Sequence, residues 1–354
     1  MGLAEQLPTD YNNLLAAVLI IQRIVHGYAA FLGGKMTVEC CRAWFPDHFD
    51  LTVGLEACGY YIGGALATFM GGYVYEAWGY FAPYLCWSLI ALTIWIYNFI
   101  VMPRTADPVL VKPKDRSAGT SIEAPWADDT VQAEEGEEEA EKVEPCHGLS
   151  WLISIPLVAM SLTVMLEGFT AAITTPYLAK TFDVSISRGS SYVFALFLGL
   201  MAGSATSGSI LQLGWISASK VMAAGSFLCV IMVILVFPGE DIQLLYKLVP
   251  KLAYLGIFLQ GYGSQMIGVA SLSAVEQIHT VIGQRSYSKS NKSTAATVWL
   301  CAWMVAVYGG HLVALVVMKS MSFTQGGWMM AGFSAVSVVI SIAQDITVHR
   351  ACRQ

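Results

Sequence analysis

The chain has 354 residues, of which 56% are apolar and only 12% are charged, and its formal net charge is −6. A soluble domain carries about 25% charged residues, so the composition excludes an ordinary soluble domain, and its hydrophobicity excludes a wholly disordered chain. The acidity is local, because ten of the 25 Asp and Glu residues lie between Glu123 and Glu144. The sequence has no basic patch of the kind that binds nucleic acid, so we expect no nucleic-acid partner.

Apolar stretches of membrane-spanning length follow one another along the chain. A spanning helix needs about 20 mostly apolar residues. About nine stretches meet this requirement, at residues 14–34, 52–75, 80–102, 150–177, 190–212, 216–237, 250–275, 295–318 and 325–346. We therefore predict an all-α, multi-pass membrane protein whose main partner is the lipid bilayer.

A hydrophilic segment divides the predicted spans into three and six. Residues 103–149 contain Pro, Lys, Asp and the run EEGEEEAEKVE, a composition typical of disordered linkers. We predict a partial N-terminal half over residues 1–102, a disordered acidic linker over 103–149, and a six-helix C-terminal half over 150–354. The linker is either a solvated spacer or a regulatory segment.

The basic residues predict an orientation. With nine spans, thirteen Lys and Arg residues fall on the side that carries the linker and the C-terminus, and five fall on the other side. Basic loop residues favour the cytosolic side. The linker and the C-terminus are therefore predicted to be cytosolic.

Glu167 is the strongest candidate for a functional residue. An ionisable side chain within a bilayer costs roughly 2.5–3.5 kcal/mol on insertion scales, and such residues face the bundle interior or a cavity. Thr163, Glu167, Thr170 and Thr174 have the spacing that places them on one helix face. A carboxylate among hydroxyl groups suits the binding of a proton or an organic cation. The alternative is a structural Glu that bonds to a neighbouring helix.

Other polar residues in the predicted spans are weaker candidates for binding. Glu56 lies near the start of the second span and is either functional or solvated at the interface. Arg23 either pairs with a carboxylate across the bundle or contacts substrate. Tyr262 and Gln265 of the seventh span either line a pathway or bond to neighbouring helices, and His311 is most simply a packed polar residue.

Small residues repeat along the second span. Gly59, Gly63, Ala67 and Gly71 recur every four residues, and Gly64 and Gly72 lie beside them. Such a face lets helices approach closely. It also lets one helix slide or rock against another, so the motif predicts either simple packing or a conformational role.

No motif for enzyme chemistry is present. The sequence has no HExxH, GxSxG or GxxxxGK[ST] pattern, and none of its eight Cys residues has zinc-ligand spacing. We expect no enzymatic activity, no cofactor and no metal. A membrane-embedded receptor or enzyme is a remote alternative.

Several segments resemble the vesicular amine and polyamine transporter family, solute carrier family 18, of the major facilitator superfamily. The segment GGYVYEAWGYFAPYL, residues 71–85, looks like the hairpin of that family's fifth and sixth helices. QRIVHG, residues 22–27, resembles a motif of its fourth helix, and Leu166-Glu167 resembles the Leu-Glu of its seventh. FLGLMAGSATSGSI, residues 197–210, looks like its eighth helix.

This resemblance implies a major-facilitator-type bundle that lacks the family's first three helices. It implies proton-coupled antiport of organic amines or polyamines at a vesicular or lysosomal membrane, or at the plasma membrane, with Glu167 alternating between proton and cation. The family usually has Pro where this chain has Gly168. The alternatives are a truncated, non-transporting membrane protein and a transporter of another small solute.

Overall fold

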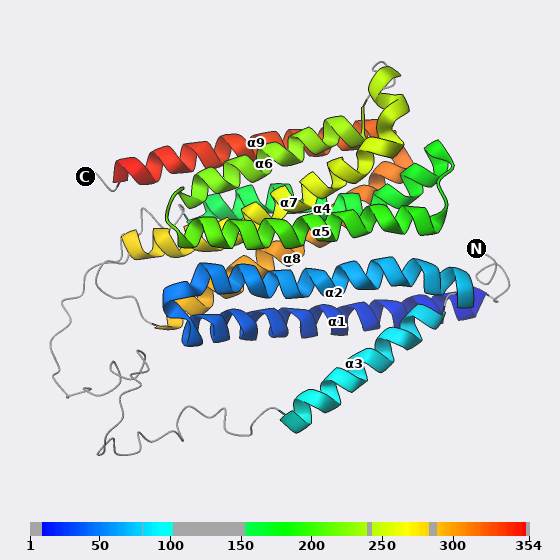
Figure 1. Cartoon of the computed structure of the whole chain (residues 1–354), viewed down its shortest axis with the longest axis horizontal. Coiled ribbons are helices and arrows are strands. Elements are labelled where there is room, and N and C mark those ends of the chain that lie inside the picture. The colour runs from blue at the N-terminus through cyan, green and yellow to red at the C-terminus, as the bar shows by residue number, and fades with distance from the viewer. Residues whose placement is uncertain (1–8, 80, 102–152, 239–242, 283–288, 352–354) are drawn as a thin grey trace. The chain divides into compact units, whose positions relative to one another are not determined.

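The computed structural model describes residues 9–79, 81–101, 153–238, 243–282 and 289–351 (Figure 1). All regular structure in these ranges is helical, without a strand. The α-helices are, in chain order, α1 (Thr9–Trp44), α2 (Phe49–Trp78), α3 (Phe81–Val101), α4 (Ser154–Phe182), α5 (Ile186–Gln212), α6 (Ala218–Val236), α7 (Gln243–Ile282), α8 (Lys289–Ser320) and α9 (Phe323–Ala351), with a short 3-10 helix at Pro46–His48.

The predicted all-helical class is confirmed, and each predicted span falls on one of these helices. Within the described ranges, α4, α5, α6, α8 and α9 are long and apolar enough to cross a membrane. Helices suit this environment because every backbone polar group is satisfied within the segment. The spans predicted on α1, α2, α3 and α7 stay predictions, and the linker at 103–149 lies outside the described residues.

The chain divides into two compact units. One contains α3, a single apolar helix of 21 residues, and the other contains α1, α2 and α4 to α9. Gly79, at the end of α2, has a φ of 83°, a value that glycine adopts without steric cost. The candidate site lies wholly in the larger unit.

Glycines set the closest helix contacts of the larger unit. A Cβ atom on Gly168 of α4 would lie 2.0 Å from the carbonyl oxygen of Val307 in α8, and one on Gly310 would lie 2.0 Å from that of Met165. No side chain fits at either position. Small residues of this kind let membrane helices pack through dispersion contacts, because lipid removes the usual hydrophobic drive.

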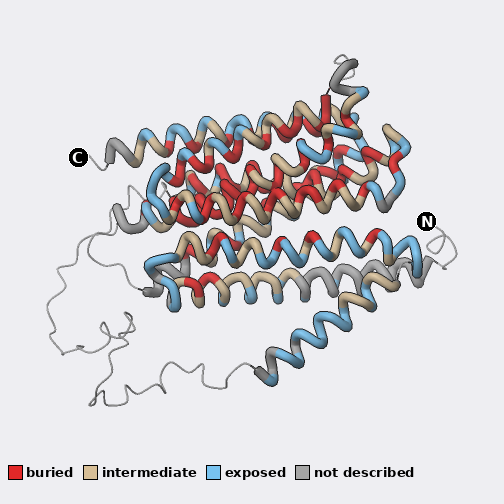
Figure 2. Tube along the Cα trace, in the orientation of Figure 1, coloured by how far each residue is buried: buried red, intermediate tan, exposed pale blue. Residues whose placement is uncertain are grey.

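Burial concentrates in α4 to α9 (Figure 2). One apolar cluster gathers around Phe169, Tyr192 and Phe237, and another around Met160 and Met222. Many of the apolar side chains described on α1 and α2, such as those of Tyr28, Leu55 and Tyr60, are exposed. These two helices therefore have a smaller protein core than α4 to α9.

Helix α2 approaches α5 closely. A Cβ atom on Gly54 would lie 2.6 Å from the carbonyl oxygen of Ser204, and one on Gly64 would lie 2.5 Å from the ring of Phe197. Phe69 and Phe194 extend the contact, with ring centroids 5.3 Å apart. This interface holds α2 against α5.

Candidate functional site

Glu167 lies in the middle of α4 with one carboxylate oxygen unsatisfied. Its Oε2 atom is buried and has no hydrogen-bond partner in the described part of the chain. Tyr60 and Tyr61 of α2 and Cys229 of α6 are within electrostatic range of the carboxylate. A buried polar group without a partner costs free energy. This oxygen atom could therefore accept a hydrogen bond from a ligand or a water molecule, or bind a proton.

Tyr60 is the residue that relates Glu167 to a second carboxylate and to another tyrosine. Tyr60 is within electrostatic range of Glu56, Glu167 and Tyr308 of α8. The rings of Tyr60 and Tyr61 meet edge to face with centroids 5.3 Å apart. Tyr60 and Tyr308 are both exposed. The sequence prediction missed all three tyrosines, although the Tyr60-Tyr61 pair at one turn from Glu56 was a usable signal.

The close approach of α4 and α8 positions Glu167. The next residue, Gly168, touches the α8 backbone, as described above. On α8, Nδ1 of His311 lies 2.8 Å from the carbonyl oxygen of Val307. His311 therefore bonds to its own helix and packs beside Gly168, in keeping with the simpler interpretation of this residue.

The three threonines of the predicted stripe are all buried. Thr174 Oγ1 donates to the carbonyl oxygen of Thr170 at 2.7 Å, and Thr163 Oγ1 lies 3.5 Å from Ser226 Oγ of α6. Thr170 Oγ1 has no partner among the described residues. Two of the three hydroxyl groups are thus engaged within the bundle, and Thr170 is the one left able to bind a ligand.

Gln265 joins three helices near the site. Its Nε2 atom donates to the hydroxyl of Tyr61, and its Oε1 atom lies 3.3 Å from Ser204 Oγ. Gln265 is almost wholly buried. Side-chain hydrogen bonds between membrane helices contribute about 0.6 kcal/mol on average. The structure therefore gives Gln265 a bonding role between helices, which was one of its two predicted roles.

Gln260 provides a second link at the level of Glu167. Its Nε2 atom donates to the carbonyl oxygen of Leu166 at 2.8 Å. Its Oε1 atom is buried without a partner in the described ranges. Gln260 is thus bonded to Leu166, the residue before Glu167, and Gln260 and Glu167 each have one buried oxygen atom without a partner in the described ranges.

The remaining predicted site residues are less clearly placed. Glu56 is half-buried in α2 and makes no ion pair within the described ranges. Arg23 lies in α1, but its side chain is outside the described residues. The ring of Tyr262 stacks on Phe258 with centroids 6.3 Å apart, and a Cβ on Gly203 would meet its carbonyl oxygen at 2.3 Å. Tyr262 is therefore part of the α5–α7 packing.

The glycines of α2 separate into two kinds. A Cβ on Gly59, Gly63 or Gly71 would have no described atom within 4 Å. Gly64 instead contacts Phe197, and Gly72 is buried. The predicted repeat of every four residues is thus an open face in the described structure, while the close contact with α5 comes from glycines outside that repeat.

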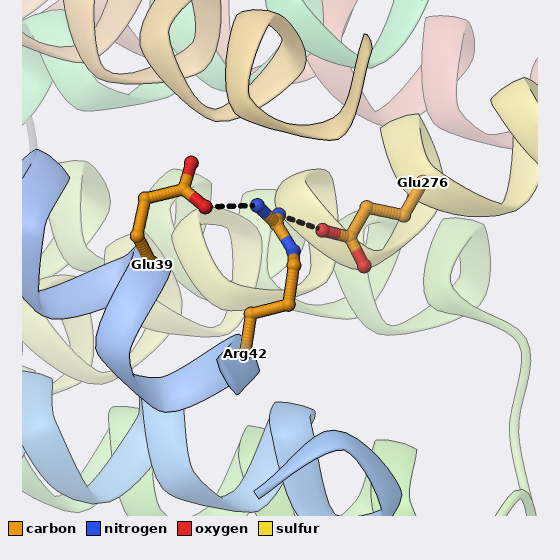
Figure 3. A network of polar contacts seen from close by, with 3 residues as sticks. All are labelled: Glu39, Arg42 and Glu276. Atoms are coloured by element: carbon orange, nitrogen blue, oxygen red, sulfur yellow. Dashed lines mark hydrogen bonds and ion pairs between the residues drawn. The ribbon is translucent and has the colours of Figure 1, made fainter. Parts of the chain in front are cut away.

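Arg42 is the centre of an ionic cluster that the sequence prediction missed (Figure 3). Arg42 Nη1 lies 3.1 Å from Glu39 Oε2, and Arg42 Nη2 pairs with Glu276 of α7. The guanidinium group also lies 5.1 Å from the ring centroid of Phe49. The Glu39–Arg42 spacing was visible in the sequence, but Glu276 is 234 residues from Arg42, and only the fold brings them together.

Asp50 adds a third carboxylate to this cluster. Burial raises the pKa of Asp50, the negative charge of Glu276 raises it further, and a hydrogen bond with Ser273 offsets part of the shift. We define the Arg42 cluster as Glu39, Arg42, Asp50 and Glu276. The cluster has three acidic groups and one basic group. Protonation of one carboxylate would therefore reduce the repulsion among the acidic groups.

No group of three His, Cys, Asp or Glu residues that could hold a metal ion occurs among the residues described. Comparison of the chain with family models, with curated proteins and with solved structures finds no match in any of the three.

Proposed function

We propose that the chain is a membrane transporter of small organic solutes. The observation that carries this proposal is the unsatisfied carboxylate oxygen of Glu167 within the apolar helix α4. Ionisable residues inside membrane spans are costly, and they usually mark a substrate or ion pathway. A purely structural Glu would be expected to have both oxygen atoms bonded.

The more specific proposal is proton-coupled antiport of organic amines or polyamines. An ammonium group is held by charge-assisted hydrogen bonds to a carboxylate and by the faces of aromatic rings. The carboxylates of Glu56 and Glu167 and the ring of Tyr308 all lie within electrostatic range of Tyr60. The choice of amines over other solutes rests on the resemblance of residues 71–85 and 197–210 to the vesicular amine and polyamine transporters.

Exchange would require Glu167 to hold either a proton or the substrate cation, but not both. In this scheme α1 and α2 rock against α4 to α9, as the two halves of related transporter folds do. The ion pair between Arg42 and Glu276 crosses between these two groups of helices. It would break and re-form during each cycle.

Uptake into liposomes tests the proposal. Purified protein is reconstituted, a pH gradient is imposed with the lumen acidic, and entry of radiolabelled spermine is followed. Glu167→Gln is expected to abolish gradient-driven uptake, whereas the matched control Asp183→Asn is expected to retain it. Asp183 lies at the end of α4 with a φ of 52°, a conformation that Asn tolerates.

Two results would count against the proposal. Uptake that is unchanged in Glu167→Gln would remove the carboxylate mechanism. Uptake of a neutral solute in place of spermine, with the same dependence on Glu167, would keep the transporter and replace its substrate class.

Location is a separate proposal with its own test. A proton-coupled amine antiporter needs an acidified compartment, so we propose a vesicular or lysosomal membrane, with the plasma membrane as the alternative. Fractionation of cells that express a tagged chain decides between them. The tag should follow the proton-pumping fractions and not the surface-labelled membrane.

A further inference from the structure

A line of polar side chains runs along the buried face of α9. Ser334, Ser337, Ser341 and Gln344 are spaced by three, four and three residues, which places them on one side of the helix. Each has at most 2% of its surface exposed. We call these four residues the hydroxyl column. Helices α4 and α6 both pack against α9.

Three oxygen atoms of the column have no partner in the described structure: Ser334 Oγ, Ser341 Oγ and Gln344 Oε1. Elsewhere in the bundle, the buried hydroxyl groups of Ser204 and Ser207 donate to the carbonyl one turn earlier, whereas those of Thr170 and Ser264 also have no partner among the described residues. Leaving a buried polar group unsatisfied costs about 1–3 kcal/mol. Buried water molecules commonly satisfy such groups.

Ser337, within the column, belongs to a directed chain of hydroxyl groups. Ser337 Oγ donates to the carbonyl oxygen of Ala159 at 2.8 Å, which uses its only proton. Ser226 Oγ, 2.8 Å away, must therefore donate to Ser337. Thr163 Oγ1 lies 3.5 Å from Ser226. Thr163 is one turn of α4 before Glu167, so the chain ends beside the candidate site.

The outer end of the column reaches a charged surface. Asp345 follows Gln344 and accepts from Ser217 Oγ at 2.6 Å, and Lys220 Nζ lies 3.9 Å from its carboxylate. With a rise of about 1.5 Å per residue, Ser334 is roughly 16 Å along α9 from Asp345. That distance is about half of a hydrocarbon core of about 30 Å.

We propose that α4, α6 and α9 enclose a file of water molecules along the hydroxyl column, from Asp345 to Thr163. The water satisfies the three unpartnered oxygen atoms. A proton relay toward Thr163 forms when Ser337 turns its hydroxyl away from the Ala159 carbonyl and donates to Ser226, which in turn donates to Thr163. Its use in supplying protons to Glu167 rests on the proposed function, but the presence of the water does not. The competing arrangement is a dry interface in which the serines serve only as small packing residues.

Radiolytic hydroxyl labelling tests for the water directly, because the radicals form from water beside the labelled side chain. The full chain carrying Ser341→Cys is irradiated in lipid, and oxidation is located by mass spectrometry. Residue 341 is expected to label about tenfold faster than the native Met330, which is wholly buried in an apolar cluster one turn beyond the column. Val339→Cys, at an exposed position on the same helix, is the control for a lipid-facing residue.

Equal, slow labelling of residue 341 and Met330 would overturn the proposal. If Ser341→Cys does not fold, Gln344→Met gives the same readout, because it conserves side-chain length and is readily oxidised. Fast labelling at either position supports the water file, and slow labelling at the position tested contradicts it.

The proton role has a separate readout in the spermine assay. Ser341→Val, which fills the space for water, is expected to slow gradient-driven uptake at least several-fold, while Ser341→Ala leaves room and retains more of it. A labelled column in a protein without uptake would contradict the proposed function alone. A dry column in a protein with Glu167-dependent uptake would contradict the water file alone.

Discussion

The Arg42 cluster and Glu167 handle buried charge in opposite ways. In the cluster, a guanidinium group binds Glu39 and Glu276 directly, at the ends of predicted spans. Glu167 sits within an apolar helix, where the described structure gives one of its oxygen atoms no partner. We expect an ionisable group that holds helices together to be paired, and one that binds a ligand to be left unpaired at a cost in stability. The comparison predicts opposite effects for carboxylate removal at the two places.

The largest expected effect comes from the backbone contact that positions Glu167. Gly168→Ala would place a Cβ atom 2.0 Å from the Val307 carbonyl oxygen, and the backbone there cannot easily move. We expect a loss of about 3 kcal/mol in unfolding free energy, since overpacking of a tight interior costs up to this amount or more. Thermal unfolding in detergent measures it.

Gly59→Ala is the matched control, because no described atom lies within 4 Å of its Cβ position. It should be neutral or stabilising by about 0.5–1 kcal/mol, as expected for Ala over Gly in a helix. Equal destabilisation by the two variants would mean that the α4–α8 contact is not what positions Glu167.

The second effect concerns the paired charge. Glu276→Gln removes the α7 partner of Arg42 and leaves a partly buried guanidinium group underbonded. We expect a loss of about 1–3 kcal/mol, between the values for exposed and buried ion pairs. A double-mutant cycle with Arg42→Gln, read by thermal unfolding, isolates the coupling. A coupling energy of zero would show that the ion pair between Arg42 and Glu276 does not contribute to the stability of the fold.

The third effect should have the opposite sign. Glu167→Gln replaces an unpartnered carboxyl group with a neutral amide at the same place, so the apparent melting temperature is expected to rise, by a free energy of about 1 kcal/mol. The same variant should lose spermine uptake. A fall in the melting temperature would instead indicate a structural bond to Glu167, and the contrast with the Arg42 cluster would disappear.

The smallest effect is a pH dependence located in the Arg42 cluster. The pKa of Asp50 is raised in the folded protein by burial and by Glu276. Its contribution to stability is therefore fully present below the unfolded pKa, near 3.8, and is lost as the pH rises through the folded pKa. Mild acid should strengthen the cluster by relieving carboxylate repulsion.

Melting curves recorded between about pH 4 and about pH 8 provide the measurement, because this range starts near the ordinary pKa of a carboxyl group and covers values raised above it. Asp50→Asn should be more stable than the parent at neutral pH and should show a flatter pH profile. Asp47→Asn, at an exposed position three residues away, is the control. Identical profiles for the parent and Asp50→Asn would remove Asp50 as the titrating group.

The sequence by itself determined the helical membrane class and the positions of the helices. Long apolar runs in a chain with few charges have only one common solution, since lipid leaves backbone groups no partner outside the helix. It also singled out Glu167, because a carboxylate in such a run is conspicuous. The stripe of Thr163, Thr170 and Thr174 followed from helical periodicity alone.

Only the tertiary structure decided what these residues meet. It brought Tyr60 and Tyr61 of α2 within electrostatic range of Glu167 in α4, and it brought Glu276 of α7 to Arg42 of α1. It also showed that the close contacts of α2 run through Gly54 and Gly64, while the more regular repeat of Gly59, Gly63 and Gly71 meets no described atom. Periodicity places residues on a face of a helix, but the neighbour across that face depends on how all the helices pack.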